Sequence, residues 1–234
     1  MMKRRKRIAL YGGTFDPVHL GHMAVAKGLI KAFELDEVLF IPAHVAPHKR
    51  DTRVSPPLHR FAMLALATED EDALSISTVE LEAPERPYTV ETVAHLQHEL
   101  GPGAQLFFVM GADSWSEITT WREWERLLLM TDHIVVARPG YDLSMANVTP
   151  TIRQRIVDLR GIDIGEIVTR VAELEEPRLY VTDAVFMDVS ATEIRDNISD
   201  GESIEWLSLV QPQVGNYIRK YGLYKKVYET ESNG

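Results

Sequence analysis

Two histidines three residues apart, at the end of a glycine-rich segment, are the side chains of this sequence best suited to binding an anion. The segment spans residues 12–22 and reads Gly-Gly-Thr-Phe-Asp-Pro-Val-His-Leu-Gly-His. Its glycines let backbone amides approach a ligand closely, and His19 and His22 share one face of a helix that we expect to begin there. Free amides and the dipole at a helix N-terminus attract negative charge, and the imidazoles add donors. The segment predicts a phosphate site; the competing interpretation is two core histidines that cap a helix.

The glycine spacing of this segment differs from that of the two commonest phosphate-binding loops. It matches neither G-x-G-x-x-G nor G-x-x-x-x-G-K-[ST]. Gly21, between the histidines, removes a side chain that would block a planar ring lying across the start of the helix. If the imidazoles are charged beside a phosphate, their pKa values should be raised, and the ligand should bind less tightly as the pH rises past them.

Strands and helices alternate along the chain. Short apolar runs typical of strands lie at residues 8–11, 37–41, 74–78, 105–110, 133–137 and 178–182. Helical segments lie at residues 20–34, 58–68, 88–100, 191–198 and 214–221, with two short helices around Trp115, Trp121 and Trp124. We expect residues 140–177 to be rich in helix. The alternation predicts an α/β fold, a doubly wound parallel sheet with a small helical C-terminal part. Such sheets bind ligands beyond their strand ends where the strand order reverses, and Gly12 and Gly111 fall at strand ends.

Composition limits the class of protein. The 234 residues include 25 Lys and Arg, 35 Asp and Glu and 45% apolar residues, so the net charge is −10 and a sizeable core can form. No apolar run reaches the roughly 18–20 residues of a membrane-spanning helix. Without cysteine the chain has no disulfide, thiolate nucleophile or cysteine-ligated metal. We expect a cytoplasmic protein outside the membrane.

Basic residues are concentrated at the N-terminus. Residues 3–7 hold five of the 25, which leaves 20 against 35 acidic residues in the rest of the chain and disfavours nucleic-acid binding. The apolar run that follows lasts four residues, against the roughly 7–15 of a signal peptide. We expect residues 1–7 to form a disordered basic tail (a contact with RNA is the alternative), residues 8–225 a single domain with a helical subregion at about 185–225, and residues 226–234 a flexible tail. The sequence is compatible with a homo-oligomer.

Residues 12–22 resemble the signature of the nucleotidylyltransferase superfamily, in which paired histidines bind the phosphates of ATP. From about Ile8 to Tyr224 the chain is similar to bacterial nicotinate-nucleotide adenylyltransferases, least so over residues 140–177. The resemblance implies a Rossmann-like nucleotidyltransferase fold, with ATP and nicotinate mononucleotide as partners. Mg²⁺ would accompany ATP, with no metal site of the protein's own. The mononucleotide phosphate would attack the α-phosphorus of ATP in line, giving deamido-NAD and pyrophosphate in NAD biosynthesis. The implied catalytic residues are His19, His22 and Arg195.

Two further motifs extend the implied ATP site. Met110-Gly111-Ala112-Asp113 matches a strand-end motif whose aspartate accepts hydrogen bonds from the ribose hydroxyls; by itself, this aspartate would be interpreted as a helix cap. Val189–Arg195 resembles Ile-Ser-Ser-Thr-x-Ile-Arg, with departures at Val189 and Ala191, and Ser190 with Glu193 also forms a capping box. The implied ATP contacts are Gly12, Gly13, Phe15, His19, His22, Gly111, Asp113, Ser190, Thr192 and Arg195.

Further matches concern the phosphate of the mononucleotide. Pro47-His48-Lys49 resembles a loop that contacts this phosphate through an ammonium group and a ring N–H. Arg138 resembles a phosphate or carboxylate contact. Both segments could instead be ordinary loop surface. Arg60 and Met63 also match the family, and we interpret them as packing residues.

Other matches concern the pyridine ring. Pro87-Tyr88-Thr89 stands where the family has Ser-Tyr-Thr, so Thr89 lies either beside the ring or at a helix cap. Trp121 would stack on the ring, whereas we interpret Trp124 as a core residue. The implied contacts with the mononucleotide are Thr14, His48, Lys49, Thr89, Trp121 and Arg138.

Three alternatives stay open. Phosphopantetheine adenylyltransferases share the His-x-Gly-His pattern, although the chain length, the Pro-His-Lys loop, Thr89 and Trp121 favour the nicotinate enzymes. An enzyme that prefers nicotinamide mononucleotide would differ only in the amide donors around the ring. A nucleotide-sensing protein that has lost turnover is the non-enzymatic alternative, and the joint presence of His19, His22 and the other matched residues argues against it.

Overall fold

A parallel sheet forms the centre of the computed structural model, which describes residues 4–44, 54–137, 143–172, 177–185, 187–201 and 204–225. Its strands are β1 (Lys6–Gly13), β2 (Glu37–Pro42), β3 (Leu74–Ile76), β4 (Ala104–Gly111), β5 (Asp132–Val136), β6 (Ile156–Asp158) and β7 (Leu179–Thr182). They are ordered β3-β2-β1-β4-β5-β7-β6, and every pair is parallel. The order reverses between β1 and β4, because the chain builds outward on one side of β1 and then crosses to the other. The predicted doubly wound α/β sheet is confirmed.

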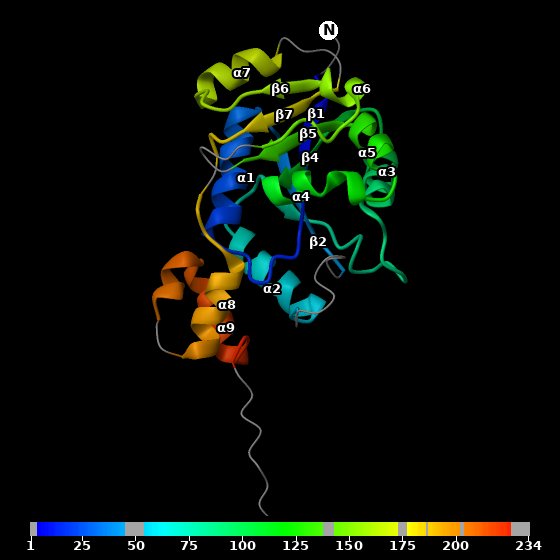
Figure 1. Cartoon of the computed structure of the whole chain (residues 1–234). Coiled ribbons are helices and arrows are strands. Elements are labelled where there is room, and N and C mark those ends of the chain that lie inside the picture. The colour runs from blue at the N-terminus through cyan, green and yellow to red at the C-terminus, as the bar shows by residue number, and fades with distance from the viewer. Residues whose placement is uncertain are drawn as a thin grey trace, which may run out of the picture.

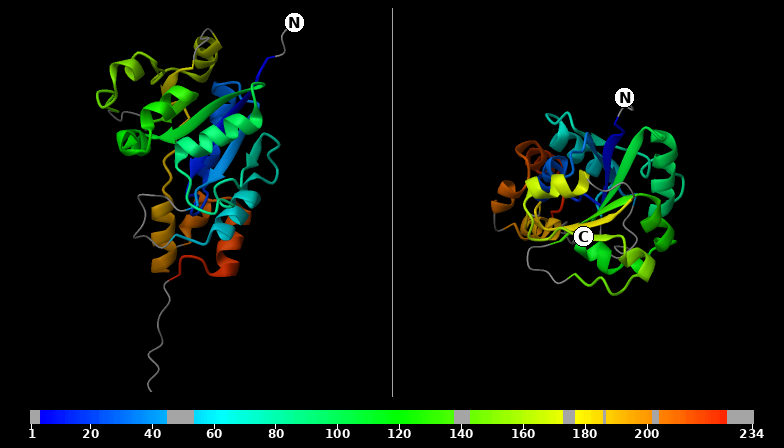
Figure 2. Two further views of the ribbon diagram at one scale, coloured as in Figure 1. Left: turned by 90° about the vertical axis from the view of Figure 1, so that its right-hand side faces the viewer. Right: turned by 90° about the horizontal axis from the view of Figure 1, so that it is seen from above.

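Helices cover both faces of this sheet. One face carries α1 (Leu20–Ala32), α2 (Pro57–Thr68), α7 (Ile164–Ala172), α8 (Ala191–Asp200) and α9 (Pro212–Tyr221). The other carries α3 (Thr89–Leu100), α4 (Ala112–Ser116), α5 (Trp124–Met130) and α6 (Pro150–Arg153). The view from above in Figure 2 separates the blue, yellow and orange helices from the green ones on the far side of the strands. Two 3-10 helices, η1 (Ile118–Thr120) and η2 (Glu205–Leu209), complete the layers.

The central strands are apolar along their whole length because both of their faces are buried. In β1, Ile8 and Leu10 pack into the cluster under α3 and α5, whereas Ala9 packs under α1. In β4, Phe107 and Phe108 face opposite clusters in the same way. A strand whose side chains point alternately into two cores has a continuous apolar sequence, and β4 was predicted from such a run.

Residues 140–177 differ from the expectation. They contain α6 and α7 but also the edge strand β6, which the sequence did not predict. This strand has three residues and pairs with β7 through Ile156 and Leu179 among others. A run this short shows no periodicity, so its strand conformation depends on the neighbouring strand.

The start of the chain also differs. Lys6 and Arg7 belong to β1, so the expectation of a disordered tail was wrong for them. Lys6 forms an ion pair of 2.6 Å with Glu37, at the start of the adjacent strand, and Arg4 one of 2.7 Å with Asp36. These acidic partners allow β1 to begin inside the basic segment. The tail predicted at residues 226–234 lies outside the described residues.

The C-terminal helices form the small helical part that was predicted. Figure 1 shows α8 and α9 beside α2, at the end of the molecule opposite the N-terminus. Their apolar side chains, including Ile194 and Ile218, join the cluster under α1 and α2. Within the described ranges, no helix is long and apolar enough to cross a membrane.

Candidate functional site

A cleft of about 250 Å³ opens at the carboxyl ends of β1, β4 and β5, next to the point where the strand order reverses. Four residues predicted for ATP line it, namely His19, His22, Gly111 and Asp113. The remaining walls come from these strand ends, from α1 and from the segment that precedes α8. Sheets of this topology bind their ligands at this position.

The two histidines form a stacked pair on one side of the cleft. Their ring centroids are 3.7 Å apart and the ring planes are inclined by 27°. His19 immediately precedes α1 with extended backbone, and its N–H donates to Nδ1 of His22 at 3.3 Å. The rings therefore meet at the very start of the helix, where its free amides add to their donors.

His19 is the more buried of the two rings, with 6% of its surface exposed. Burial lowers the pKa of His19 to about 4, so this imidazole is neutral at neutral pH. Its Nδ1 atom is buried and makes no hydrogen bond with any described residue. The expected raised pKa therefore requires a bound anion, because the protein alone favours the neutral ring.

Gly21 makes room for this ring, as the sequence suggested. A Cβ atom at this position would lie 3.0 Å from Nδ1 and Cε1 of His19, and 3.2 Å from the carbonyl oxygen of Met187. Any side chain would thus displace either the imidazole or the segment that leads into α8. Glycine lets the histidine and this segment share one wall of the cleft.

The side chain of Phe15 lies in the core and does not line the cleft. Its side chain is buried, with ring centroids 5.0 Å from His22, 5.3 Å from Phe40 and 5.7 Å from Tyr11. A left-handed backbone, with φ of +51°, turns the ring back under β1, where a Cβ at Gly13 would lie 2.7 Å from it. The ring packs against that of His22, so only the backbone of Phe15 can contact a ligand in the cleft.

Gly111 and Asp113 form the opposite side of the cleft. Gly111 ends β4 and precedes α4, and a Cβ atom there would meet no other atom within 4 Å. Gly111, not Asp113, occupies the cap position, so the carboxylate of Asp113 is exposed in the first turn of α4. The interpretation of Asp113 as a helix cap was wrong, and its side chain is free to accept hydrogen bonds from a ligand.

The start of α8 lies beside the cleft and is tied to the loop after β1. Ser190 caps this helix by accepting the N–H of Glu193 at 3.5 Å, so the capping interpretation of the serine is confirmed. Arg195 donates to the carbonyl oxygen of Asp16 at 2.7 Å and to the hydroxyl of Thr192 at 3.1 Å. Met187 and Val189, just before the helix, line the cleft itself. Asp16 and Arg195 are 179 residues apart in the chain, and their hydrogen bond makes the two motifs neighbours in space.

Comparisons with known proteins identify the family of this chain. Residues 10–197, which include both motifs, match the cytidylyltransferase-like family. The chain is 33% identical over 233 residues to a probable nicotinate-nucleotide adenylyltransferase of Thermoanaerobacter sp. (strain X514), covering 100% of both chains. It is 36% identical to the corresponding protein of Desulfatibacillum aliphaticivorans, covering 93% of this chain and 99% of that one. The chain belongs to the nicotinate-nucleotide adenylyltransferase family.

A solved structure shows the same fold. It is the Plasmodium falciparum nicotinic acid mononucleotide adenylyltransferase complexed with NaAD, with a TM-score of 0.68 and 20% identity, covering 94% of this chain and 97% of that chain. This chain therefore has the same fold as that solved structure.

Only some of the residues that the family resemblance assigned to the mononucleotide lie within the described ranges. His48, Lys49 and Arg138 lie outside the described residues. Thr89 is the first residue of α3, and the cap position belongs to Tyr88, so the interpretation of Thr89 as a helix cap was wrong. Trp121 ends η1, between two helices, and packs edge-on against Phe108 with centroids 6.4 Å apart.

One contact brings the two pyridine-ring segments together. The guanidinium of Arg122, next to Trp121, lies 4.6 Å from the centroid of the Tyr88 ring. The start of α3, with Thr89, and the segment around Trp121 therefore lie close together on the α3 side of the sheet. The contacts of Thr89 and Trp121 with a pyridine ring stay a prediction.

Arg60 is a residue whose importance the sequence analysis missed. It was interpreted as packing, and it is indeed fully buried, but its guanidinium donates to three backbone carbonyls. Nε reaches Ser55 at 3.1 Å, Nη1 reaches Thr14 at 2.8 Å and Nη2 reaches His44 at 3.1 Å. An arginine within an apolar helix segment is the signal that could have revealed this role. Through these hydrogen bonds, Arg60 joins the loop after β1 to the two ends of the segment between β2 and α2.

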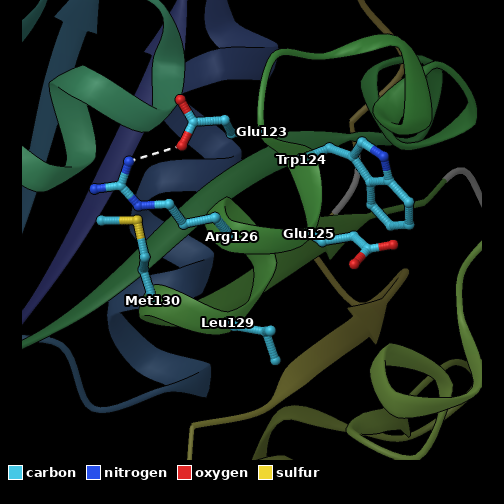
Figure 3. Close-up of a pocket in the computed structure, with 6 residues that line it drawn as sticks. All are labelled: Glu123, Trp124, Glu125, Arg126, Leu129 and Met130. Atoms are coloured by element: carbon cyan, nitrogen blue, oxygen red, sulfur yellow. Dashed lines mark hydrogen bonds and ion pairs between the residues drawn. The ribbon is translucent and has the colours of Figure 1, made fainter.

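A larger hollow of about 750 Å³ lies on the outer surface of α5, away from the strand ends. Figure 3 shows its lining residues, in which Arg126 is paired with Glu123 at 2.8 Å and Trp124 points to the other side; they are Glu123, Trp124, Glu125, Arg126, Leu129 and Met130. Trp124, which we expected in the core, is only partly buried here. The hollow holds no group of converging donors, so we do not assign it to the reaction.

Proposed function

We propose that the cleft binds ATP and that the protein transfers the adenylyl group to nicotinate mononucleotide. This is the activity of a nicotinate-nucleotide adenylyltransferase, which supplies NAD biosynthesis. The stacked pair of His19 and His22, facing Gly111 and Asp113 across the cleft, is the observation that carries the proposal. The pair offers donors to a polyphosphate, and the far wall offers an acceptor to a ribose.

The reaction needs no nucleophile from the protein. A phosphate oxygen of the mononucleotide attacks the α-phosphorus of ATP, a new P–O bond forms, and the bond to the leaving pyrophosphate breaks. The protein has to hold two anions that repel each other and to neutralise the charge that builds on the oxygens. Each charge-assisted hydrogen bond contributes about 1.5–3 kcal/mol. A few converging donors would supply much of the rate enhancement.

On the ATP side, each residue has a separate task. The histidine pair binds phosphate oxygens, Gly111 lets the nucleotide lie against the end of β4, and the carboxylate of Asp113 accepts the ribose hydroxyls. Arg195 and the start of α8, with Ser190 and Thr192, approach the triphosphate from the wall of the cleft that borders His19. The backbone amides of Gly12, Gly13 and Phe15 complete this half.

On the mononucleotide side, Trp121 and Thr89 hold the pyridine ring. Thr14, His48, Lys49 and Arg138 take its phosphate. The carboxylate of nicotinate is favoured over the carboxamide of nicotinamide because the family resemblance is to the acid-using enzymes. The position of Thr89 at the start of α3 supports this choice, since free helix amides attract an anion.

Mg²⁺ enters, in this proposal, as part of the ATP substrate. Among the described residues, no group of three or more histidine or carboxylate side chains is placed to hold a metal ion. Phosphate oxygens and water are the ligands that Mg²⁺ commonly keeps in nucleotide sites. We place the reaction in the cytoplasm, where ATP is available.

The test is a substrate panel with the full-length protein. ATP and Mg²⁺ are incubated with nicotinate mononucleotide, nicotinamide mononucleotide or phosphopantetheine, and pyrophosphate release is followed while mass spectrometry identifies the product. We expect the highest kcat/KM with nicotinate mononucleotide and deamido-NAD as product. Preference for the amide would correct the substrate, activity only with phosphopantetheine would reject the proposed function, and ATP binding without pyrophosphate release would indicate a sensing protein.

A further inference from the structure

Asp16, in the loop between β1 and α1, connects three distant parts of the chain. It is 3% exposed, and each of its acceptor oxygens contacts a different segment. Oδ2 accepts the N–H of Ser55 at 3.0 Å, Oδ1 accepts the hydroxyl of Tyr224 at 2.6 Å, and the backbone oxygen accepts Nη1 of Arg195 at 2.7 Å. Hydrogen bonds to Ser55, Tyr224 and Arg195 thus fix the position of the loop before the histidines, and the same contacts tie Arg195 to this loop.

Tyr224 reaches this carboxyl group from beyond the end of α9. Gly222 ends the helix in a left-handed conformation, and Tyr224 itself has φ of +67°. A bulky residue rarely adopts this backbone region and does so when surrounding contacts fix it. Its ring is partly buried, and burial together with Asp16 raises the pKa of Tyr224. The phenol therefore keeps its proton and donates to Asp16 throughout the neutral range.

We propose that Tyr224 is a positioning residue for adenylyl transfer, acting through Asp16 on Arg195. The hydroxyl holds the Asp16 loop in the conformation whose carbonyl orients the Arg195 guanidinium at the first turns of α8. Arg195 donates to the backbone oxygen of Asp16 and Tyr224 donates to its carboxylate, which places both groups at one residue. The inference rests on the proposed function, since it assigns Arg195 to ATP.

The chain offers a matched control for the tyrosine. Tyr217 on α9 also uses its hydroxyl in a hydrogen bond, at 2.9 Å to Nδ1 of His59, and it does not contact the loop after β1 in the described structure. Tyr224→Phe and Tyr217→Phe each remove one phenol oxygen from the same helical region. We expect Tyr224→Phe to lower kcat/KM for ATP about tenfold, with KM for nicotinate mononucleotide and the unfolding midpoint close to those of Tyr217→Phe.

A double-mutant cycle separates positioning from general support. If Tyr224 acts through Arg195, then Tyr224→Phe has little further effect on kcat/KM for ATP in an Arg195→Ala background. An equal loss in both backgrounds, or a Tyr224→Phe enzyme that matches Tyr217→Phe, would overturn the inference. If Tyr224→Phe does not fold, Asp16→Asn takes its place in the same cycle. We expect its effect on kcat/KM for ATP to be smaller in the Arg195→Ala background than in the wild type. Equal effects in the two backgrounds would overturn the inference. An inactive wild-type protein would instead overturn the proposed function.

Discussion

The imidazole rings of His19 and His22 are stacked with their centroids 3.7 Å apart. His19 is buried, whereas His22 is only half-buried at the first turn of α1. Two like charges at this distance repel each other, so the pair does not carry two protons unless an anion lies beside it. The charge of the site is therefore set by its ligand.

Removal of the half-buried ring should damage catalysis and leave the fold intact. His22→Ala deletes one donor to the charge that develops on the phosphates, and we expect kcat to fall about 10²–10³-fold, as for one oxyanion donor. Steady-state pyrophosphate release measures this loss, and circular dichroism checks the fold. His95→Ala is the matched control, because His95 is exposed on α3 and paired only with Glu99 in the described structure. Near-normal turnover in His22→Ala would remove the histidine pair from the mechanism.

Binding of ATP should be accompanied by proton uptake at His19. The pKa of this ring is about 4 in the ligand-free protein because of burial, and a neighbouring phosphate favours the charged form. The protonated site binds ATP better, so affinity should fall as the pH rises through the raised pKa. Titration calorimetry at pH 6, in two buffers of different ionisation enthalpy, counts the protons taken up. His19→Asn should take up fewer protons than the wild type, and equal uptake would contradict the prediction.

The fold could be predicted where the sequence carries its own periodicity. The apolar run of β4 and the spacing in α1 are long enough to specify their elements without help from neighbours. β6 could not be predicted, because its three residues become a strand only beside β7. Lys6 and Arg7 were wrongly predicted to lie in a disordered tail for the same reason. The acidic residues that contact them, Glu37 and Asp36, lie about 30 positions away in the chain.

Acid should destabilise the protein through His133, which is fully buried in β5. Burial lowers its pKa to about 3, whereas the unfolded chain binds a proton near pH 6.5. Below pH 6.5 the unfolded state holds a proton that the folded state lacks, so the free energy of unfolding falls as the pH decreases. Between pH 6.5 and 5 this residue should account for about 2 kcal/mol. Urea unfolding at pH 7 and pH 5 measures the loss, and His133→Asn should show a smaller one; an unchanged difference would exclude this histidine as the cause.

Gly111→Ala should weaken ATP binding without affecting stability. The added methyl group would meet no protein atom within 4 Å, yet it would project into the cleft where we place the nucleotide. We expect KM for ATP to rise roughly tenfold, the scale on which one methyl group matters in a fitted pocket. Gly103→Ala, also free of contacts within 4 Å but at the other end of β4, should leave KM unchanged. Equal KM values for the two variants would place the nucleotide elsewhere.

The parts of the site that could be predicted are those encoded by adjacent residues. His19 with His22, and Gly111 with Asp113, are each specified within a few positions, and the fold brings them to one cleft. The residues that hold these segments in place have partners far along the chain. Tyr224 lies 208 residues from Asp16, and neither type nor spacing signals such a contact. The burial of the Phe15 side chain could not be predicted, because its motif gives no indication that a left-handed backbone turns the ring into the core.

Arg60→Lys should affect stability and catalysis together. The guanidinium reaches the carbonyls of Thr14, Ser55 and His44 through three separate nitrogens, and a lysine ammonium cannot reproduce this planar fork. At least one buried carbonyl would lose its partner, so the free energy of unfolding should fall by about 2–3 kcal/mol. Because Thr14 belongs to the loop that leads to His19, kcat/KM should fall as well. Arg126→Lys, at an exposed pair with Glu123, should change stability by less than about 0.5 kcal/mol. Urea unfolding and steady-state kinetics on both variants test this, and an Arg60→Lys enzyme as stable and active as Arg126→Lys would show that the fork does not hold the site.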